Sequence, residues 1–546
     1  MNVIEFILFA CIILQPTMSI VKTSINPDIS VLNVERSVTL ATGGRKLVKP
    51  IMKSHQAIAL DHLPTTRHYT FNNVPANLFN GVRYQANISK GSISTLGHMT
   101  LKIIVDVAGA DAVLAPVPLW FQRCDIRTST NNEVVATMYD DSCLFSIMSA
   151  LKKGQTRALL KNINMDYDDE GYMGTANALA PGRHIFFLPL VTVFNGYDLY
   201  WKNAKSDLLF DLQPPNTIVS SGSGTVTCGG LQLICEAAEL SPSDLAIYEN
   251  NEKMYVKENI FLDPIRVPFT AQHLTAGSSN NLLDLTPLQG KCAFMVVYIR
   301  ESGASTVKNT LMKCLNIGDN EGAGFDILDA TGNSIYGMGS AIESKLLRNE
   351  HSVHHFDSDF LAHKAMYVLP FCTSIPNSYS GKINGFQQFD GEKLQLQLSL
   401  PPAPVKEVHT ITSTAAPDAG FYRFDFRSET SEEIPYNATP AEMSAAFNKM
   451  KQAARLNITA EFSGSLSSGT SITATFTTPE TAGLNGDPLD IFSNGLSAAG
   501  SPVSSKAVRS VAGTSGLATG LYDVTVYGYV FKRASYFNGT LLSRLI

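Results

Sequence analysis

The sequence predicts an all-β chain built from sandwiches or barrels. Runs rich in β-branched and aromatic residues recur at 99–107, 184–194, 225–236, 292–299 and 393–400. Several of these runs alternate polar and apolar residues and are bounded by turn-forming clusters, a pattern typical of half-buried strands. Because the strands recur without a βαβ rhythm, sandwiches or barrels are favoured over a parallel sheet. With 546 residues the chain is too long for one compact domain and suits two or three.

Charge is scarce in this chain. Charged residues make up 16% of the sequence, well below the usual quarter. The 42 Lys and Arg against 48 Asp and Glu give a formal net charge of -6. This balance excludes a protein that binds nucleic acid through a basic surface, so we expect no sequence-specific nucleic-acid binding. Because charged residues are depleted at interface cores, the low charge favours a surface largely covered by other protein.

The eight cysteines do not form a recognisable metal-binding pattern. Cys228 and Cys235 are the only closely spaced pair, and no second pair exists to complete a zinc ribbon. Cysteine at this low density favours buried free thiols over disulfides, in a protein made in a reducing cytoplasm.

The N-terminal segment 1–20 is apolar and short. Residues 3–14 are apolar apart from Glu5, and this run falls short of the ~20 residues that a membrane span needs. A signal peptide would carry Lys or Arg before the apolar run. Three interpretations stay open: a weak signal peptide, an arm packed on a membrane or a neighbouring subunit, or a true start at Met18. We favour the second and third.

Between 405 and 518 the sequence changes character. After the prolines of 401–404 it becomes rich in Ser, Thr, Ala and Gly, and it returns to a dense aromatic run at 522–533. A change that reverses near the end predicts a domain inserted at a loop between neighbouring strands of one interrupted sheet.

Helical segments are few. Residues 143–151 have an apolar face at helical spacing. The clearest helix is predicted at 441–456, where Thr439 can cap the first turn, Pro440 suits the first position and Glu442 completes a capping box.

The segment 367–390 contains a distinctive pattern. It reads Tyr367-Val-Leu-Pro-Phe371, then Pro376-Asn-Ser-Tyr-Ser-Gly381-Lys-Ile-Asn384, then Phe389-Asp390. This pattern resembles one near the end of double jelly-roll major capsid proteins. That family forms the shells of large eukaryotic DNA viruses and of tailless, internal-membrane bacteriophages. Tyr379 stands where the family has Pro, and Gln387-Gln388 where the larger viruses carry Ser-Arg. These departures place the resemblance nearer the bacteriophages.

Other segments resemble the same family in the same order. Residues 118–126 look like the strand that opens the second half of a first barrel. Residues 188–190, followed by 197–201, resemble the family's Leu-Pro-Leu strand and its partner, and 529–539 look like the closing strand. Within 420–447, two strand-like runs and the capped helix resemble a small β-sandwich module common in phage structural proteins.

The resemblance implies two consecutive jelly-roll β-barrels, a double jelly roll, with a small inserted Ig-like β-sandwich domain that contains one helix. The implied ranges are an apolar arm at 1–20, a first barrel at 21–240, a second barrel at 241–404 completed by 519–546, and the inserted module at 405–518.

The function that the resemblance implies is that of a major capsid protein. Such a chain forms pseudo-hexameric homotrimers that contact neighbouring capsomers and minor capsid or vertex proteins and tile an icosahedral virion shell around the genome. An internal membrane is a further expected partner through the arm at 1–20. Two alternatives stay open: a phage receptor-binding or adhesin protein, suggested by the Ser/Thr-rich insert, and a jelly-roll glycan-processing enzyme. The enzyme would need two facing carboxylates, and the sequence provides no pair that can be named.

Two polar clusters suggest metal binding without the spacing that a metal site needs. The stretch 351–363 holds four His and two Asp, but it lacks a fixed helical His pair with a catalytic Glu. We favour a polar segment between barrels or subunits over a metal site. The acidic run 166–170 lacks EF-hand spacing, and a solvated loop is favoured over calcium between subunits.

The remaining motifs point to architecture. The Ser-rich runs contain no nucleophile elbow, and the glycine-rich 220–230 lacks the Lys of a phosphate loop and is predicted to be a hairpin. Trp120 and Trp201 are predicted to be core anchors. Gly381 is predicted to turn the chain with a positive φ, with Asn384 bonding nearby backbone groups. We therefore assign no catalytic, cofactor-binding or metal-binding residue, and expect a non-enzyme without cofactors.

Overall fold

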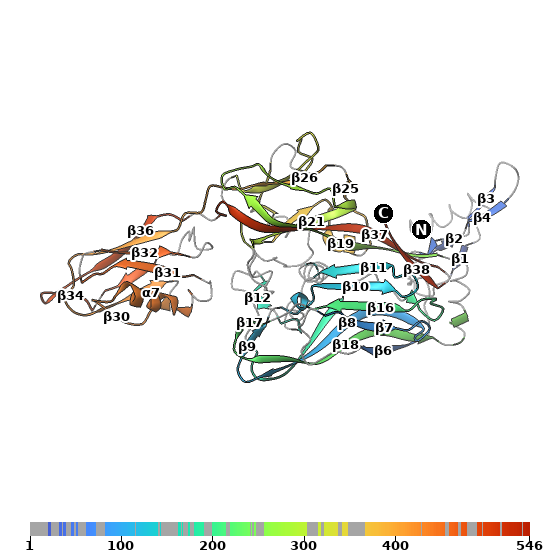
Figure 1. Cartoon of the computed structure of the whole chain (residues 1–546), viewed down its shortest axis with the longest axis horizontal. Coiled ribbons are helices and arrows are strands. Elements are labelled where there is room, and N and C mark those ends of the chain that lie inside the picture. Colours follow the sequence, from blue (N-terminus) through green and yellow to red (C-terminus); the bar gives the residue numbers. More distant parts are fainter. Residues whose placement is uncertain are drawn as a thin grey trace, which may run out of the picture.

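The computed structural model describes residues 62–71, 82–139, 179–190, 199–240, 256–302, 315–347 and 366–546, with gaps inside these ranges, and several short segments elsewhere (Figure 1). Among these residues, no helix is both long and apolar enough to cross a membrane. The N-terminal arm and the predicted helix at 143–151 lie outside the described residues.

Eight of the described strands between residues 62 and 240 form a jelly roll. They are β6 (His62–Thr70), β7 (Tyr84–Ile88), β8 (Thr95–Ala108), β10 (Arg123–Thr128), β11 (Val134–Tyr139), β14 (Gly182–Leu190), β16 (Leu208–Gln213) and β18 (Thr225–Leu240). One sheet has the order β11-β10-β16-β7 and the other the order β14-β8-β18-β6. When these strands are lettered B to I in chain order, the sheets read F-E-H-C and G-D-I-B, the two interleaved Greek keys of a jelly roll.

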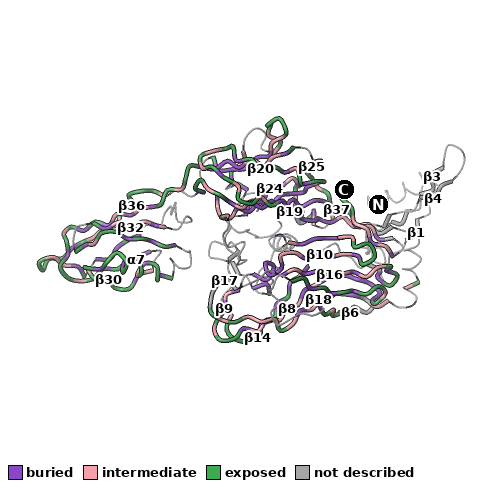
Figure 2. The backbone as a smooth tube through the Cα atoms, in the orientation of Figure 1, coloured by how far each residue is buried: buried purple, intermediate pink, exposed green. Residues whose placement is uncertain are grey.

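The alternation predicted for the strands places their apolar side chains between the two sheets. Along β8, Leu101, Ile103 and Val105 are fully buried, and the residues between them face outward. Trp120 and Trp201 are also buried, which confirms them as core anchors. The backbone coloured by burial shows the buried residues concentrated inside the barrels and along their boundary (Figure 2).

A second set of strands repeats the same topology. It comprises β19 (Val256–Leu274), β20 (Asn281–Asp284), β21 (Gln289–Glu301), β22 (Gly324–Leu328), β23 (Ile342–Glu343), β24 (Tyr367–Pro370), β26 (Gln395–Ser399) and β37 (Gly520–Phe537). The sheet orders are β24-β21-β37-β19-β5 and β20-β26-β22-β23. Without β5 (Ile51–Met52), which pairs in parallel with β19, these orders again read G-D-I-B and C-H-E-F. Additional strands extend the first of these sheets: β25 (Gln387–Asp390) pairs with β21, and β38 (Thr540–Leu545) pairs with β37.

The residues between β26 and β37 form a separate β-rich unit with its own core. Its first sheet has the order β31-β32-β27-β36, and β28 carries a second, smaller sheet. The elements are β27 (Val408–Ser413), β28 (Phe421–Phe426), β29 (Glu429–Thr430), β30 (Ile434–Pro435), α7 (Pro440–Asn448), β31 (Ala460–Gly464), β32 (Ser471–Phe476), β33 (Asp490–Phe492), β34 (Ser497–Ala498), β35 (Ser501–Pro502) and β36 (Ser505–Val511). Figure 1 shows this unit projecting from one end of the second barrel.

Helix α7 has the predicted capping box. The Thr439 hydroxyl accepts a hydrogen bond from the Glu442 N–H, and the Glu442 carboxylate accepts one from the Thr439 N–H at 2.8 Å. Helix α7 ends at Asn448, and Lys451 and Ala453 are helical again, so the predicted helix 441–456 is interrupted at 449–450. The physical reason is a tightened last turn, because the Met450 N–H bonds to the Phe447 carbonyl three residues back. The Asn448 side chain also accepts the Ala460 N–H, which ties the helix end to β31.

Shorter elements complete the described chain. They are β1 (Ile20–Lys22), β2 (Leu32–Val34), β3 (Arg36–Thr39), β4 (Arg45–Val48), β5 (Ile51–Met52), β9 (Ala112–Leu114), η2 (Val117–Trp120), β12 (Asp166–Tyr167), β13 (Met173–Gly174), β15 (Leu199–Tyr200), β17 (Val219–Gly222) and α6 (Ile375–Tyr379).

Three local predictions need correction. The segment 220–230 is not a hairpin, because β17 pairs with β9, whereas β18 pairs with β8 and β6. Residues 117–120 form the 3₁₀ helix η2 ahead of β10 rather than a strand, since Pro118 cannot donate to a sheet. The segment after the Leu-Pro-Leu run does not pair with that run. Instead, β15 pairs with Thr95 and Leu96 of β8, just before the part of β8 that pairs with β14.

Candidate functional site: the junction between the barrels

Strand β21 is buried on both of its faces. Phe294, Val296 and Tyr298 belong to the apolar cluster of the first barrel, whereas Met295 and Val297 belong to the core of the second. Neighbouring residues of a strand point to opposite faces of the sheet. The sheet that contains β21 is therefore one wall of the second barrel and, through its outer face, the surface that packs on the first.

Aromatic side chains fill this junction. The rings of Phe294 and Tyr529 stack with centroids 4.3 Å apart. Tyr527 lies edge-on to Tyr298 at 5.8 Å and is 5.9 Å from Tyr139 of the first barrel. Of these pairs, Tyr139–Tyr527 joins the two barrels and contributes about 0.5–1.5 kcal/mol beyond its burial. The other rings line the face of the second barrel that packs on the first.

A chain of polar groups crosses the junction. The Asp263 carboxylate of β19 is 3% exposed; it accepts the Thr137 N–H of β11 at 3.0 Å and pairs with the Lys532 ammonium at 2.5 Å. The Thr137 hydroxyl in turn donates to Asp125 at 3.0 Å, and Asp125 accepts from Arg123 at 2.9 Å. Burial raises the pKa of the Asp263 carboxyl, and the Lys532 charge and the Thr137 N–H oppose that rise. In this network the bond from the Thr137 N–H to the Asp263 carboxylate joins the two barrels. If the barrels slid past each other, that buried bond would break, so it favours one register.

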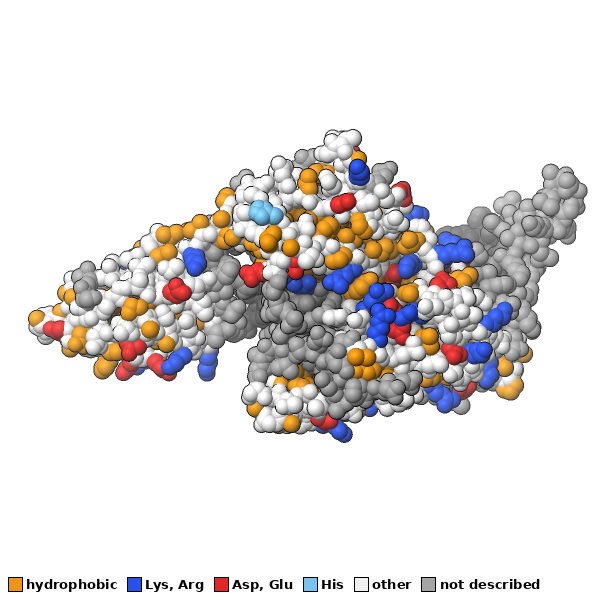
Figure 3. All heavy atoms as spheres, viewed as in Figure 1, with side chains coloured by type: hydrophobic (Ala, Val, Ile, Leu, Met, Phe, Trp, Pro, Cys, Tyr) orange, Lys and Arg blue, Asp and Glu red, His pale blue; other side chains and the backbone are white. Residues whose placement is uncertain are grey.

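Further contacts connect the two barrels away from this network. The Tyr529 hydroxyl donates to the Ser142 carbonyl at 3.2 Å, and the Ser543 N–H of β38 donates to the Glu133 carboxylate at 3.0 Å. Through the Ser543 bond, the C-terminal strand β38 links the second barrel to the first. Basic side chains also gather where the barrels meet, on the face shown in Figure 3.

The inserted unit leaves the second barrel at an end formed by several connections. The Gly277 N–H, after β19, donates to the Pro401 carbonyl at 2.8 Å, and the Ser302 N–H, after β21, donates to the Leu521 carbonyl at 3.2 Å. The loops after β19 and β21 thus hold the two ends of the insert. In the first barrel the equivalent end carries β9 and β17, which lie on the same side of the molecule as the insert (Figure 1). Both barrels therefore present equivalent connections in the same direction.

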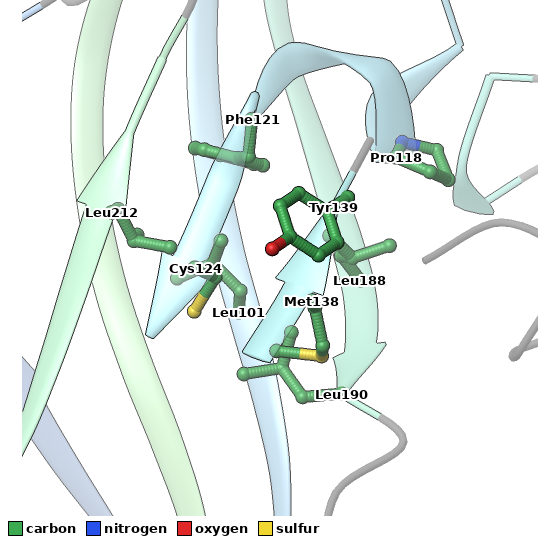
Figure 4. Close-up of a pocket in the computed structure, with 9 residues that line it drawn as sticks. All are labelled: Leu101, Pro118, Phe121, Cys124, Met138, Tyr139, Leu188, Leu190 and Leu212. Carbon is green, nitrogen blue, oxygen red and sulfur yellow. The ribbon is translucent and has the colours of Figure 1, made fainter. Parts of the chain in front are cut away.

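In the described part of the first barrel, the space between the two sheets is filled by side chains. The apolar cavity in Figure 4 has a volume of about 10 Å³ and is lined by leucines together with Pro118, Phe121, Cys124, Met138 and Tyr139. This is about the volume of a single water, and an apolar lining offers a water no partners. The barrel is thus a structural core.

The His, Asp and Cys residues that were considered as metal ligands do not form a site in the described part of the chain. The His-rich stretch 351–363 lies outside it, and of the acidic run 166–170 only β12 is described, paired with β13. The described residues hold no cluster of three potential metal ligands. The described cysteines are free, as predicted for them, and burial raises the pKa of the Cys235 thiol to about 12, which makes it unreactive.

Sequence reasoning missed the residues of the junction. Asp263 lies in the largely apolar strand run 260–265, and Lys532 directly follows the apolar run 526–531. A charged residue in such a run is a signal of a buried ion pair, although its partner cannot be read from local sequence.

Two jelly rolls in tandem, packed side by side with their equivalent ends aligned, define the double jelly-roll fold. Solved structures agree. The crystal structure of PBCV-1 VP54 fitted into a cryo-EM reconstruction of the virophage Sputnik matches with a TM-score of 0.52 at 10% identity, covering 89% of this chain and 98% of that one. A quasi-atomic model of the PBCV-1 virus capsid matches with the same values. No family model matches the sequence, and no curated protein does. The chain therefore has the all-β double jelly-roll fold of viral capsid proteins, shared at low sequence identity.

Proposed function

We propose that this chain is a major capsid protein and that its role is structural rather than enzymatic. The observation that carries the proposal is the tandem pair of jelly rolls with aligned ends. Each jelly roll packs two sheets face to face, which limits the exposed strand edges that would otherwise cause aggregation at high copy number. The similarity to the PBCV-1 capsid structures supports the same role.

The contact within one chain suggests how several chains would assemble. Here the G-D-I-B sheet of the second barrel packs on the β11 side of the first barrel. Repeating that head-to-tail contact between chains would place the G-D-I-B sheet of each first barrel against the second barrel of a neighbour. Three chains would then close a ring of six barrels. We propose this pseudo-hexameric homotrimer as the unit that tiles an icosahedral virion shell and contacts neighbouring capsomers and vertex proteins.

The first barrel's G-D-I-B sheet has the surface that such a contact requires. On β14 the side chains of Ile185 and Phe187 are 48% and 39% exposed, whereas Phe186 and Leu188 face the core. Ile104 lies opposite Ile185 on β8 and is only partly buried. Exposed apolar side chains that cluster on a sheet face mark an interaction surface, and we propose that a second copy covers it.

The ranges inferred from the sequence fit this proposal. We propose the barrels at 21–240 and at 241–404 with 519–546, and the Ig-like module at 405–518 facing outward from the shell. The arm at 1–20 would then contact an internal membrane or a neighbouring subunit. The bacteriophage origin stays a prediction from the departures at Tyr379 and Gln387.

The trimer is tested by light scattering after size exclusion. Wild type is expected to be a trimer, and Phe187→Asp is expected to give folded monomers because a charge would be buried in the contact. Phe421→Asp, at a phenylalanine of the insert that is 54% exposed, is the control and should leave the trimer intact. A wild-type monomer at all concentrations would contradict the proposal.

A further inference from the structure

The inserted unit carries an open groove of about 370 Å³. It is lined by Phe421, Tyr422, Arg423, Thr430, Glu433, Phe492 and Gly495. This volume lies in the range of small-molecule sites, roughly 300–1,000 Å³. In its size and in its polar groups, the groove differs from the 10 Å³ apolar cavity of the first barrel.

Two phenylalanine rings at the groove are left in solvent. Along β28 every second residue, such as Tyr422 and Phe424, is buried in the core of the unit. Phe421 lies on the opposite face and is 54% exposed, and Phe492 on β33 is 48% exposed. Burying a phenylalanine gains about 1.5–3 kcal/mol. Two exposed rings beside one groove therefore indicate a surface kept apolar for a ligand.

Charged groups share this face with the rings. Arg423 lies opposite Phe492 in the pairing of β28 with β33, and its guanidinium pairs with Glu433 at 2.7 Å. Phe421 is two residues before Arg423 on the same face. Glu433, Arg423 and Phe492 thus follow one another across this face. The Phe421 ring lies beside this row, two residues before Arg423 on β28.

A glycine keeps the groove open. A Cβ atom at Gly495 would lie 3.1 Å from the Phe421 carbonyl oxygen, which is closer than ordinary contacts allow. A side chain at this position would fill the space beside the Phe421 ring.

We propose that this groove binds a pyranose ring of a neutral glycan. The C–H face of a pyranose is apolar and can lie on an aromatic ring, while its hydroxyls both donate and accept hydrogen bonds. Arg423 offers only donors, Glu433 only acceptors, and the Thr430 hydroxyl can do both. Arg423 and Glu433 are the charged residues that line the groove, and their charges cancel; Asp425 and Asp490 lie further along the same face. The groove itself therefore favours an uncharged polyhydroxylated ligand over an anion or a cation.

The expected affinity of one groove is weak. An open site with two rings and a solvated ion pair is expected to bind a monosaccharide with a Kd of about 1 mM. Many copies on one particle would raise the avidity without a new contact. The binding itself does not rest on the proposed capsid role, because each chain carries a complete groove.

Saturation-transfer difference NMR on the full chain tests this inference. The probes are the methyl glycosides of glucose, galactose, mannose and N-acetylglucosamine. We expect transfer to at least one of them, strongest at the protons of one pyranose face. Phe492→Ala and Arg423→Gln are each expected to weaken binding roughly tenfold. Phe386→Ala, which removes an exposed ring from the second barrel, is the matched control and should leave binding unchanged.

Three outcomes would overturn the inference. The first is the absence of transfer to every glycoside in wild type, and the second is unchanged transfer in a Phe421→Ala/Phe492→Ala double variant. The third is binding of a proline-rich peptide, and of no glycoside, at the same residues. Because Arg423→Gln removes only an exposed side chain, it remains a test if the double variant fails to fold. None of these outcomes bears on trimer formation, so failure here is distinguishable from failure of the capsid proposal.

Discussion

Replacing Gly381 by valine should destabilise the second barrel through two separable effects. Gly381 follows α6, and its φ is +81°, as its place in the turn predicts. The Lys382 N–H donates to the Asn377 carbonyl and the Gly381 N–H to the Ser378 carbonyl, which is the Schellman ending of a helix with glycine at the left-handed position. A β-branched residue in that conformation costs about 1–3 kcal/mol.

The second effect is a steric clash. A Cβ atom at 381 would lie 2.7 Å from the Ile260 carbonyl oxygen of β19. That oxygen belongs to the backbone of a paired strand, so it cannot move away freely. Overpacking of this kind adds about 1–3 kcal/mol. The two effects together predict a loss of about 2–6 kcal/mol in the free energy of unfolding.

A control glycine separates the two effects. Gly332, also in the second barrel, has a φ of +84°, but a Cβ atom there would meet nothing within 4 Å. Gly332→Val should therefore lower the free energy of unfolding only through the backbone conformation. Gly381→Val should lower it further, because the steric clash is added. Denaturant unfolding of both variants measures the difference. Equal losses of unfolding free energy in the two variants would show that no clash with the Ile260 carbonyl oxygen occurs. A Gly381→Val variant as stable as wild type would contradict the turn geometry as well.

The position of α6 links this turn to assembly. Tyr379 of α6 lies 6.2 Å from Phe294 and 6.3 Å from Tyr529, ring centroid to ring centroid, in the junction between the barrels. A displaced helix end would disturb that packing. Gly381→Val is therefore also expected to lower the yield of trimer.

The other predictions concern the junction, the insert and one acidic turn. Asp263→Ala leaves the Lys532 charge unpaired in the junction and should cost about 3–5 kcal/mol; an unchanged thermal midpoint would contradict the proposed network. Thr439→Ala removes the helix cap and should cost about 1 kcal/mol, with faster amide exchange in α7 and no change in the barrels. Hydrogen bonds from Thr331 and Asn333 lower the pKa of the Asp329 carboxyl to about 2. Its contribution to stability should be complete above the unfolded pKa of about 4 and lost as the pH falls through about 2, and an NMR titration midpoint near 4 would refute this.

Much of the fold could be predicted because its signals are local. The alternating run at 99–107 lies within β8, and the apolar run at 292–299 lies within β21. The capping box at Thr439 was visible because its partners are three residues apart. These features depend on neighbours along the chain, which the sequence displays directly.

Pairings between distant residues could not be predicted. The glycine-rich 220–230 looked like a hairpin, but β17 finds its partner in β9, about a hundred residues earlier. The bond from Thr137 to Asp263 likewise joins residues far apart in the chain. Nothing in either local sequence specifies the partner, because sheet pairing depends on the packing of both barrels.

The groove on the insert was partly visible in the sequence. In the run 422–426, aromatic and charged residues alternate, and the preceding Phe421 falls on the same face as Arg423 and Asp425. An aromatic residue on the polar face of a strand is a signal of a binding surface. The contribution of Phe492, from a distant strand, needed the structure.

Electron microscopy of purified particles, with the copy number of the chain measured in the same preparation, tests whether this chain builds a shell from trimers of two-barrel subunits. We expect the chain to be the most abundant protein and to be arranged in trimers with a six-barrel, near-hexagonal outline, each with three projecting inserts. A chain present in only a few copies at vertices, or one that purifies solely as a monomer, would contradict this expectation.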